Sequence, residues 1–187
     1  MEDGPKSENY DRDKLRNQGL AWSYGREEEQ ERGVKQDIDV ISDFLNADHR
    51  RLDAIWTECR AAIGAADIEK LRQRYPEFAS GLRHHIRMEE EVLFPAFEER
   101  SGTQGAGPSA VMRMEHREIE AFLARIEALA ASGSRQEVLE KGGSQQAGLS
   151  DVLRSHNLKE ENILYPTSDQ MFRGEEANTL LARMRGI

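Results

Sequence analysis

Histidine and glutamate recur in this chain at a spacing that suits metal ligation. Glu89 follows His85 by four residues, and Glu160 follows His156 by four residues. Because residues i and i+4 of an α-helix point in the same direction, each pair can present one imidazole and one carboxylate to the same point. Both pairs begin the same motif, His-x-x-x-Glu-Glu-x-(Val/Ile)-Leu-aromatic-Pro, which is therefore an internal repeat.

The segments that precede the two motifs also match. Residues 48–53 read Asp-His-Arg-Arg-Leu-Asp, and residues 115–120 read Glu-His-Arg-Glu-Ile-Glu. Each segment contributes one further histidine, His49 in the first half and His116 in the second. The paired histidines are 36 residues apart in the first half and 40 in the second. We therefore expect two similar helical hairpins, related by a pseudo-twofold axis about a shared centre.

Four imidazoles and two carboxylates that project into one interior require a partner, because polar groups are costly to bury alone. Divalent iron or manganese suits a mixed set of imidazole and carboxylate ligands. Six protein ligands exceed what one tetrahedral zinc ion takes, and the repeat favours two ions. Each ion would bind two imidazoles, and both carboxylates would bridge the ions. The predicted ligands are His49, His85, Glu89, His116, His156 and Glu160.

Charge counting predicts a seventh ligand. Two divalent ions and two carboxylates leave an excess of positive charge in a poorly solvated core. Glu120 follows His116 by four residues, and together with a bridging hydroxide it would neutralise that excess. The alternative for Glu120 is a salt bridge with a nearby arginine. Asp53 is its counterpart in the first half, and its shorter side chain is expected to hydrogen-bond His49 or a metal-bound water from outside the ligand set.

Apolar residues recur at steps of three and four, the period of an amphipathic α-helix, through most of the chain. The pattern predicts long helices over about 34–64, 67–100, 108–131 and 147–164, and a short helix over 175–185. The same period places Ile163 on the inner face of the fourth helix. No segment alternates like a β-strand, so the predicted fold is an all-α, up-down-up-down four-helix bundle over residues 34–173. A polar arm (1–33) precedes it and a helical tail (174–187) follows it.

Several residues near the motifs have a structural interpretation. Phe94 and Tyr165 occupy matched positions in the repeat and are expected to pack in the core or at a helix end. Pro95 should start, kink or end a helical segment, since proline lacks the N–H that an α-helix needs. His84 and His85 point about 100° apart on a helix, so they cannot face the same centre, and His84 is expected to be solvated.

The composition of the chain limits the classes of partner it could bind and indicates the cellular compartment in which it would lie. The chain of 187 residues carries 35 acidic and 26 basic residues, a net charge of −9, which argues against binding to nucleic acid or to an anionic membrane. No apolar stretch approaches the ~18 residues of a membrane span, and the acidic N-terminus does not resemble a signal peptide. The single cysteine, Cys59, cannot form an internal disulfide and indicates a reducing compartment. We expect a cytoplasmic protein; the sequence indicates no protein partner.

The order of these motifs resembles the hemerythrin family, also called HHE cation-binding domains, over roughly residues 38–170. The matching positions are His49, His85, Glu89, His116, His156 and Glu160. The resemblance implies a four-helix bundle that holds a non-haem di-iron centre, with two iron ions joined by carboxylates and by an oxo or hydroxo bridge. Iron is favoured over manganese or a mixed pair.

Two departures from the oxygen-carrying members refine the expected function. Those members have a His-x-x-x-His pair where this chain has His116 and Glu120, and an aspartate where it has Glu160. The set found here is similar to that of bacterial hemerythrin-like proteins linked to peroxide, nitric oxide or iron handling. The expected function is therefore reaction of a di-iron centre with a small oxidant, namely dioxygen, peroxide or nitric oxide. The alternative is a non-enzymatic module that binds, stores or senses oxygen or iron.

Overall fold

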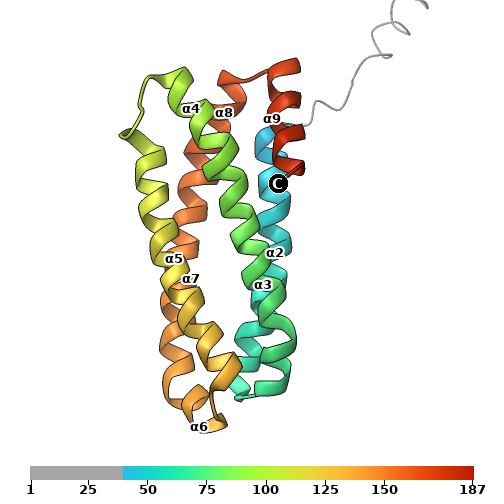
Figure 1. Ribbon diagram of the computed structural model, residues 1–187, viewed down its shortest axis with the longest axis vertical. Helices are drawn as coiled ribbons and strands as arrows, with labels where there is room; N and C mark the ends of the chain where they lie inside the picture. The colour runs from blue at the N-terminus through green and yellow to red at the C-terminus, as the bar shows by residue number, and fades with distance from the viewer. Residues whose placement is uncertain (1–39) are drawn as a thin grey trace, which may run out of the picture. The chain divides into compact units, whose positions relative to one another are not determined.

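The computed structural model describes residues 40–187, and every regular element in this part of the chain is helical. Helices α2 (Ile41–Ala65) and α3 (Ile68–Met88) form one hairpin. Helices α5 (Gly107–Ser132) and α7 (Gly143–Lys159) form the other. The four run side by side in alternating directions (Figure 1). The predicted all-α, up-down-up-down bundle is therefore confirmed, whereas the predicted arm, residues 1–33, lies outside the described residues.

Shorter helices close the two ends of the bundle (Figure 1). Helices α4 (Phe94–Ser101) and α8 (Tyr165–Met171) prolong the second and fourth long helices at one end. Helix α9 (Glu175–Arg185) packs beside α2 at that same end. It is the short C-terminal helix that the sequence predicts over 175–185. At the opposite end, α6 (Arg135–Glu137) leads into the fourth helix. Among the described helices, none combines the length and the apolar composition that crossing a membrane requires.

Two wide helical turns interrupt the bundle at matched points of the repeat. The π-helical segments η1 (Glu89–Leu93) and η3 (Glu160–Leu164) each begin at a predicted ligand and end two residues before a proline. Proline lacks an N–H, and its ring collides with the carbonyl four residues earlier, so a regular α-turn is disfavoured there. In the wider turn, the N–H of Phe94 bonds the carbonyl of Glu89, five residues back. The helix break predicted at Pro95 is therefore a π turn rather than an end of the helix. A third π segment, η2 (Val138–Gly142), directly precedes α7.

The extra residue in η3 changes which side chains face inward. Ile163, predicted to be on the inner face, is 58% exposed, and the next residue, Leu164, is 2% exposed. The prediction assumed an uninterrupted α-helical period, whereas each π turn adds one residue and rotates the rest of the helix about its axis. The same rotation changes the position of Tyr165.

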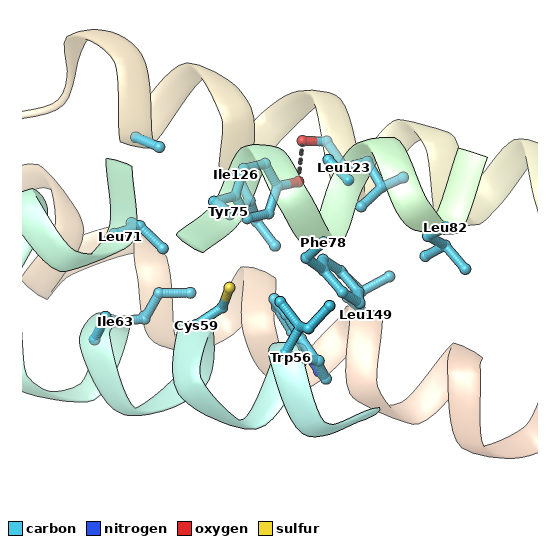
Figure 2. Packing of buried hydrophobic residues seen from close by; sticks show 14 of the residues in the cluster. Trp56, Cys59, Ile63, Leu71, Tyr75, Phe78, Leu82, Leu123, Ile126 and Leu149 are labelled. Carbon is cyan, nitrogen blue, oxygen red and sulfur yellow. Dashed lines mark hydrogen bonds between the residues drawn. The ribbon is translucent and has the colours of Figure 1, made fainter. Parts of the chain in front are cut away.

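Two apolar clusters fill the bundle, one on each side of the four central histidines. On α2, Leu45 belongs to one cluster and Leu52 to the other, with His49 between them. Figure 2 shows the cluster that contains Leu52, where the ring of Trp56 stacks on that of Phe78 with centroids 4.7 Å apart. Polar side chains at the middle of the bundle are therefore enclosed by hydrocarbon from both ends.

Candidate metal centre

Four imidazoles, one from each long helix, converge between the two apolar clusters. His49, His85, His116 and His156 lie on α2, α3, α5 and α7, and each is only 1–4% exposed. They form two ring pairs: His49 and His85 have centroids 4.5 Å apart, and His116 and His156 have centroids 4.8 Å apart. The Nε2 atoms of His116 and His156 face each other at 3.2 Å. The sequence repeat thus folds into two facing histidine pairs.

Two fully buried carboxylates connect these histidine pairs. Glu160 places Oε2 3.4 Å from Nε2 of His49 and Oε1 3.0 Å from Nε2 of His156. Glu89 places Oε2 3.3 Å from Nε2 of His116 and 3.7 Å from Nε2 of His85. Both carboxylates therefore reach both pairs, as bridging ligands would.

The donor atoms fall into two groups that are compact enough for a cation each. One group is Glu89, His116, His156 and Glu160; the other is His49, His85 and Glu160. Oε2 of Glu89 and Oε1 of Glu160 are buried without a hydrogen-bond partner among the described residues. A buried acceptor left without a partner is costly, and a cation would remove that cost. The residues therefore fit two ions bound by imidazole and carboxylate.

Every one of these imidazoles is held from outside by a second carboxylate. Each Nδ1 atom lies 2.8–3.0 Å from a carboxylate oxygen on a neighbouring helical segment. A carboxylate at this distance fixes the proton on Nδ1 and leaves the Nε2 lone pair directed at the centre. The pairs are His85 with Asp48, His116 with Glu90, His156 with Glu115, and His49 with Glu161.

Sequence reasoning missed these four outer carboxylates, although their pattern is present in the repeat. Asp48 and Glu115 directly precede the first histidine of each half, and Glu90 and Glu161 directly follow the inner glutamates. Each bonds a histidine on another helix, so the pairing cannot be read from spacing within one helix. The signal was the repeated acidic residue beside each inward ligand.

Comparison with protein families agrees with this geometry. Residues 40–168 match the hemerythrin HHE cation-binding domain. The chain belongs to the hemerythrin family. A DNA nickase from Nostoc sp. (strain PCC 7120 / SAG 25.82 / UTEX 2576) is 25% identical over 131 residues, which are 70% of this chain and 34% of the relative. The chain thus spans about a third of the length of that curated relative. No solved structure matches the chain significantly.

A buried cluster of histidine and glutamate inside an HHE domain fits a metal-binding hemerythrin-like protein. The electrostatics of the metal-free cluster show how strongly it attracts positive charge. Burial opposes ionisation of Glu160, but the neighbouring imidazoles of His156 and His49 outweigh it and hold the pKa of that carboxyl well below its usual range. Burial likewise opposes protonation of His156, but Glu160 and Glu89 raise its pKa to about 9. Burial also opposes protonation of His49 and His116, but Glu160 raises the pKa of His49 and Glu89 raises the pKa of His116. Without a metal ion, protonated imidazoles can therefore balance the negative charge of the carboxylates, which a bound cation would otherwise balance.

Tyr165 enters the cluster, which sequence reasoning did not anticipate. Its hydroxyl donates to Oε1 of Glu89 at 2.7 Å and also lies 3.1 Å from Oε2 of Glu160. The same oxygen is 3.3 Å from Nε2 of both His49 and His85. Burial and the charges of Glu160 and Glu89 raise the pKa of Tyr165 well above its usual value in the metal-free chain. Tyr165 does pack in the core, as predicted, but its hydroxyl is at the centre of the site.

Glu120 is not part of this cluster, and its predicted role as a ligand is corrected. Its side chain is 42% exposed, and its carboxylate accepts a hydrogen bond from Nε of Arg83 at 3.1 Å. The alternative of a salt bridge with arginine therefore describes Glu120. Charge counting failed because it omitted the outer carboxylates, which already supply negative charge around the histidines.

Asp53 does not make the hydrogen bond to His49 that was one of its two predicted roles; a hydrogen bond to a metal-bound water stays a prediction. The Nδ1 atom of His49 is bonded to Glu161 of η3 at 2.9 Å, and the Asp53 residue is exposed on α2. Asp53 lies one turn beyond His49, toward the apolar cluster of Trp56, whereas Glu161 comes from the fourth helix, which packs beside α2. The outer partner of His49 is therefore Glu161.

Proposed function

We propose that this hemerythrin-family bundle holds two iron ions and that its centre reacts with a small oxidant: dioxygen, peroxide or nitric oxide. The observation that carries the proposal is the convergence of four Nε2 atoms on two buried carboxylates that reach both histidine pairs. One ion would lie with His49 and His85 and the other with His116 and His156. Mixed imidazole and carboxylate ligation favours iron or manganese over zinc.

Bound iron would supply the electrons that such an oxidant takes up. The chain's own residues restrict what reaches the site, since the six inner side chains are at most 4% exposed. Apolar clusters close the bundle on both sides of the histidines, so bulk water is excluded. The outer carboxylates retain the Nδ1 protons and make the opposite ring nitrogens better donors. These features support a diatomic or peroxide ligand.

Metal analysis together with peroxide turnover tests the proposal. Protein purified without chelator should contain two iron ions per chain. After addition of hydrogen peroxide, the loaded protein should release oxygen faster than the same amount of free iron. Protein without transition metal, even after anaerobic supplementation with ferrous iron, would refute the proposal.

The near-complete burial of the centre also favours a second function, in which the bundle binds, stores or senses iron or oxygen without turnover. A ligand set enclosed on all sides retains its metal and limits exchange with solvent. Two tightly bound irons, reversible oxygen spectra and no oxygen release above free iron would support this function over an oxidoreductase.

Nucleic acid is not part of the proposal, although one relative is described as a DNA nickase. Binding to DNA requires lysine and arginine that neutralise phosphates, and this chain has a net charge of −9. Iron-loaded protein should therefore leave supercoiled plasmid as intact as iron-free protein does. Nicking that requires the loaded protein would contradict this part of the proposal.

A further inference from the structure

The two halves of the centre differ by one hydroxyl group. Tyr165 and Phe94 occupy equivalent positions in the repeat, each directly after its π turn. The ring of Phe94 stacks on His116, with an interplanar angle of 10° and centroids 5.7 Å apart. The hydroxyl of Tyr165 instead lies against His49 and His85. The pseudo-twofold symmetry of the ligands is therefore broken at this position.

The hydroxyl lies on the side of the centre that has fewer donors. The compact group around His116 and His156 contains both inner glutamates. The compact group around His49 and His85 contains only Glu160, because Oε2 of Glu89 lies closer to Nε2 of His116, at 3.3 Å, than to Nε2 of His85, at 3.7 Å. The phenol oxygen of Tyr165 would be the fourth donor of the smaller group. Each group would then offer four protein atoms to its ion.

The distances around Tyr165 are those between ligands that share one ion. Donors at about 2.1 Å from a metal lie about 3.0 Å apart in an octahedron and about 3.4 Å apart in a tetrahedron. The phenol oxygen is 3.3 Å from Nε2 of His49, 3.3 Å from Nε2 of His85 and 3.1 Å from Oε2 of Glu160. Oε2 of Glu160 is itself 3.4 Å from Nε2 of His49. These four atoms therefore surround a position that suits one cation.

The π turn accounts for the direction of this side chain. In a regular α-helix, a residue five positions after Glu160 would point about 140° away from it. In η3 the N–H of Tyr165 bonds the carbonyl of Glu160, so the turn between them holds one residue more than an α-turn and Tyr165 is rotated back toward Glu160. Glu160 and Tyr165 therefore lie on the same face of the helix.

We infer that the phenol oxygen of Tyr165 is a direct ligand of the ion held by His49 and His85, so that the two metal positions are chemically unequal. The inference rests on the proposed function, because it requires iron at that position. On coordination the iron takes the place of the phenol proton, which is released to solvent. Phe94 provides no ligand atom. The ion held by His116 and His156 would therefore be bound by imidazole and carboxylate alone, without a phenolate.

Optical and vibrational spectra of the iron-loaded chain in its ferric state test this inference. A phenolate bound to ferric iron gives a charge-transfer band in the visible and resonance-enhanced Raman modes of the tyrosine ring, and a hydrogen-bonded phenol gives neither. We expect both signals in the wild-type protein and their loss in Tyr165→Phe. Tyr75→Phe is the matched control, because Tyr75 is buried and donates to the backbone carbonyl of Leu123, within the apolar cluster shown in Figure 2.

Iron content separates the possible failures. Tyr165→Phe should keep the iron of the His116 and His156 position and bind the second iron at least about tenfold more weakly, the lower bound for loss of even an outer partner. Wild-type protein with two irons but no phenolate signals, or signals that persist in Tyr165→Phe, would overturn the inference and leave the proposed function intact. Protein that binds no iron would overturn both. If Tyr165→Phe does not fold, wild-type and Tyr75→Phe proteins grown with ring-deuterated tyrosine provide the test: unshifted Raman modes overturn the inference, and shifted modes in both support it.

Discussion

Replacing Glu90 with alanine should weaken iron binding by about 10- to 100-fold, whereas replacing Glu91 should leave it unchanged. Glu90 bonds Nδ1 of His116 at 2.8 Å and fixes the orientation and tautomer of that ring. Glu91, its neighbour in the same π turn, pairs with Arg87 on the surface. The two substitutions therefore remove the same side chain from adjacent positions but only one of them releases a ligand.

The size of the effect follows from the geometry. Loss of an outer partner of a metal-bound histidine weakens metal affinity by about 10- to 100-fold, or roughly 1.4–2.7 kcal/mol. The Glu90 side chain is 36% exposed, so its pair with His116 should contribute at most about 1 kcal/mol to the metal-free fold. Glu161→Ala should have the same effect through His49, because Glu161 occupies the equivalent place in the repeat.

The assay is an anaerobic titration of ferrous iron in competition with a chelator of known affinity. Thermal unfolding of each metal-free variant serves as the control for folding. Equal iron affinities in Glu90→Ala and Glu91→Ala, with both variants folded, would show that the outer carboxylates do not support the ligands.

Three further perturbations test separate parts of the account. His85→Ala should reduce bound iron and lower the melting temperature of the loaded protein by about 5–10 °C, whereas neighbouring His84→Ala should change neither; equal melting temperatures would contradict ligation. In metal-free protein, the raised pKa of His156 should stabilise the fold below pH ~6.5, and this contribution should disappear as the pH rises through about 9, which denaturant unfolding at each pH would detect. Iron-loaded protein should not show that loss. Glu120→Gln should leave iron content unchanged and cost less than about 1 kcal/mol, because only the exposed pair with Arg83 is lost; a drop in bound iron would restore Glu120 as a ligand.

The bundle and the meeting of its central side chains could be predicted because they depend on short-range patterns. The three- and four-residue apolar period sets each helix and its inner face. The spacing of His85 from Glu89, and of His156 from Glu160, places each pair on one face, and the repeat implies that the pairs meet. The structure brings all six predicted ligands together, and their binding of iron remains a prediction.

The remaining features depend on irregular backbone and on contacts between helices. The exposure of Ile163 and the inward hydroxyl of Tyr165 both follow from the π turn η3, which a regular helical period does not anticipate. The bonds from Glu161 to His49 and from Glu90 to His116 join different helices, so they require the packing of the bundle. The proline that ends each motif was the one local sign that the helical period would change.

The most direct test of the central claim is anomalous diffraction at the iron absorption edge from crystals of iron-loaded protein. We predict two anomalous peaks per chain, one beside His49 and His85 and one beside His116 and His156, with an oxygen of Glu160 at ligand distance from each. A single peak, a peak outside the bundle, or water alone between the four imidazoles would contradict the account.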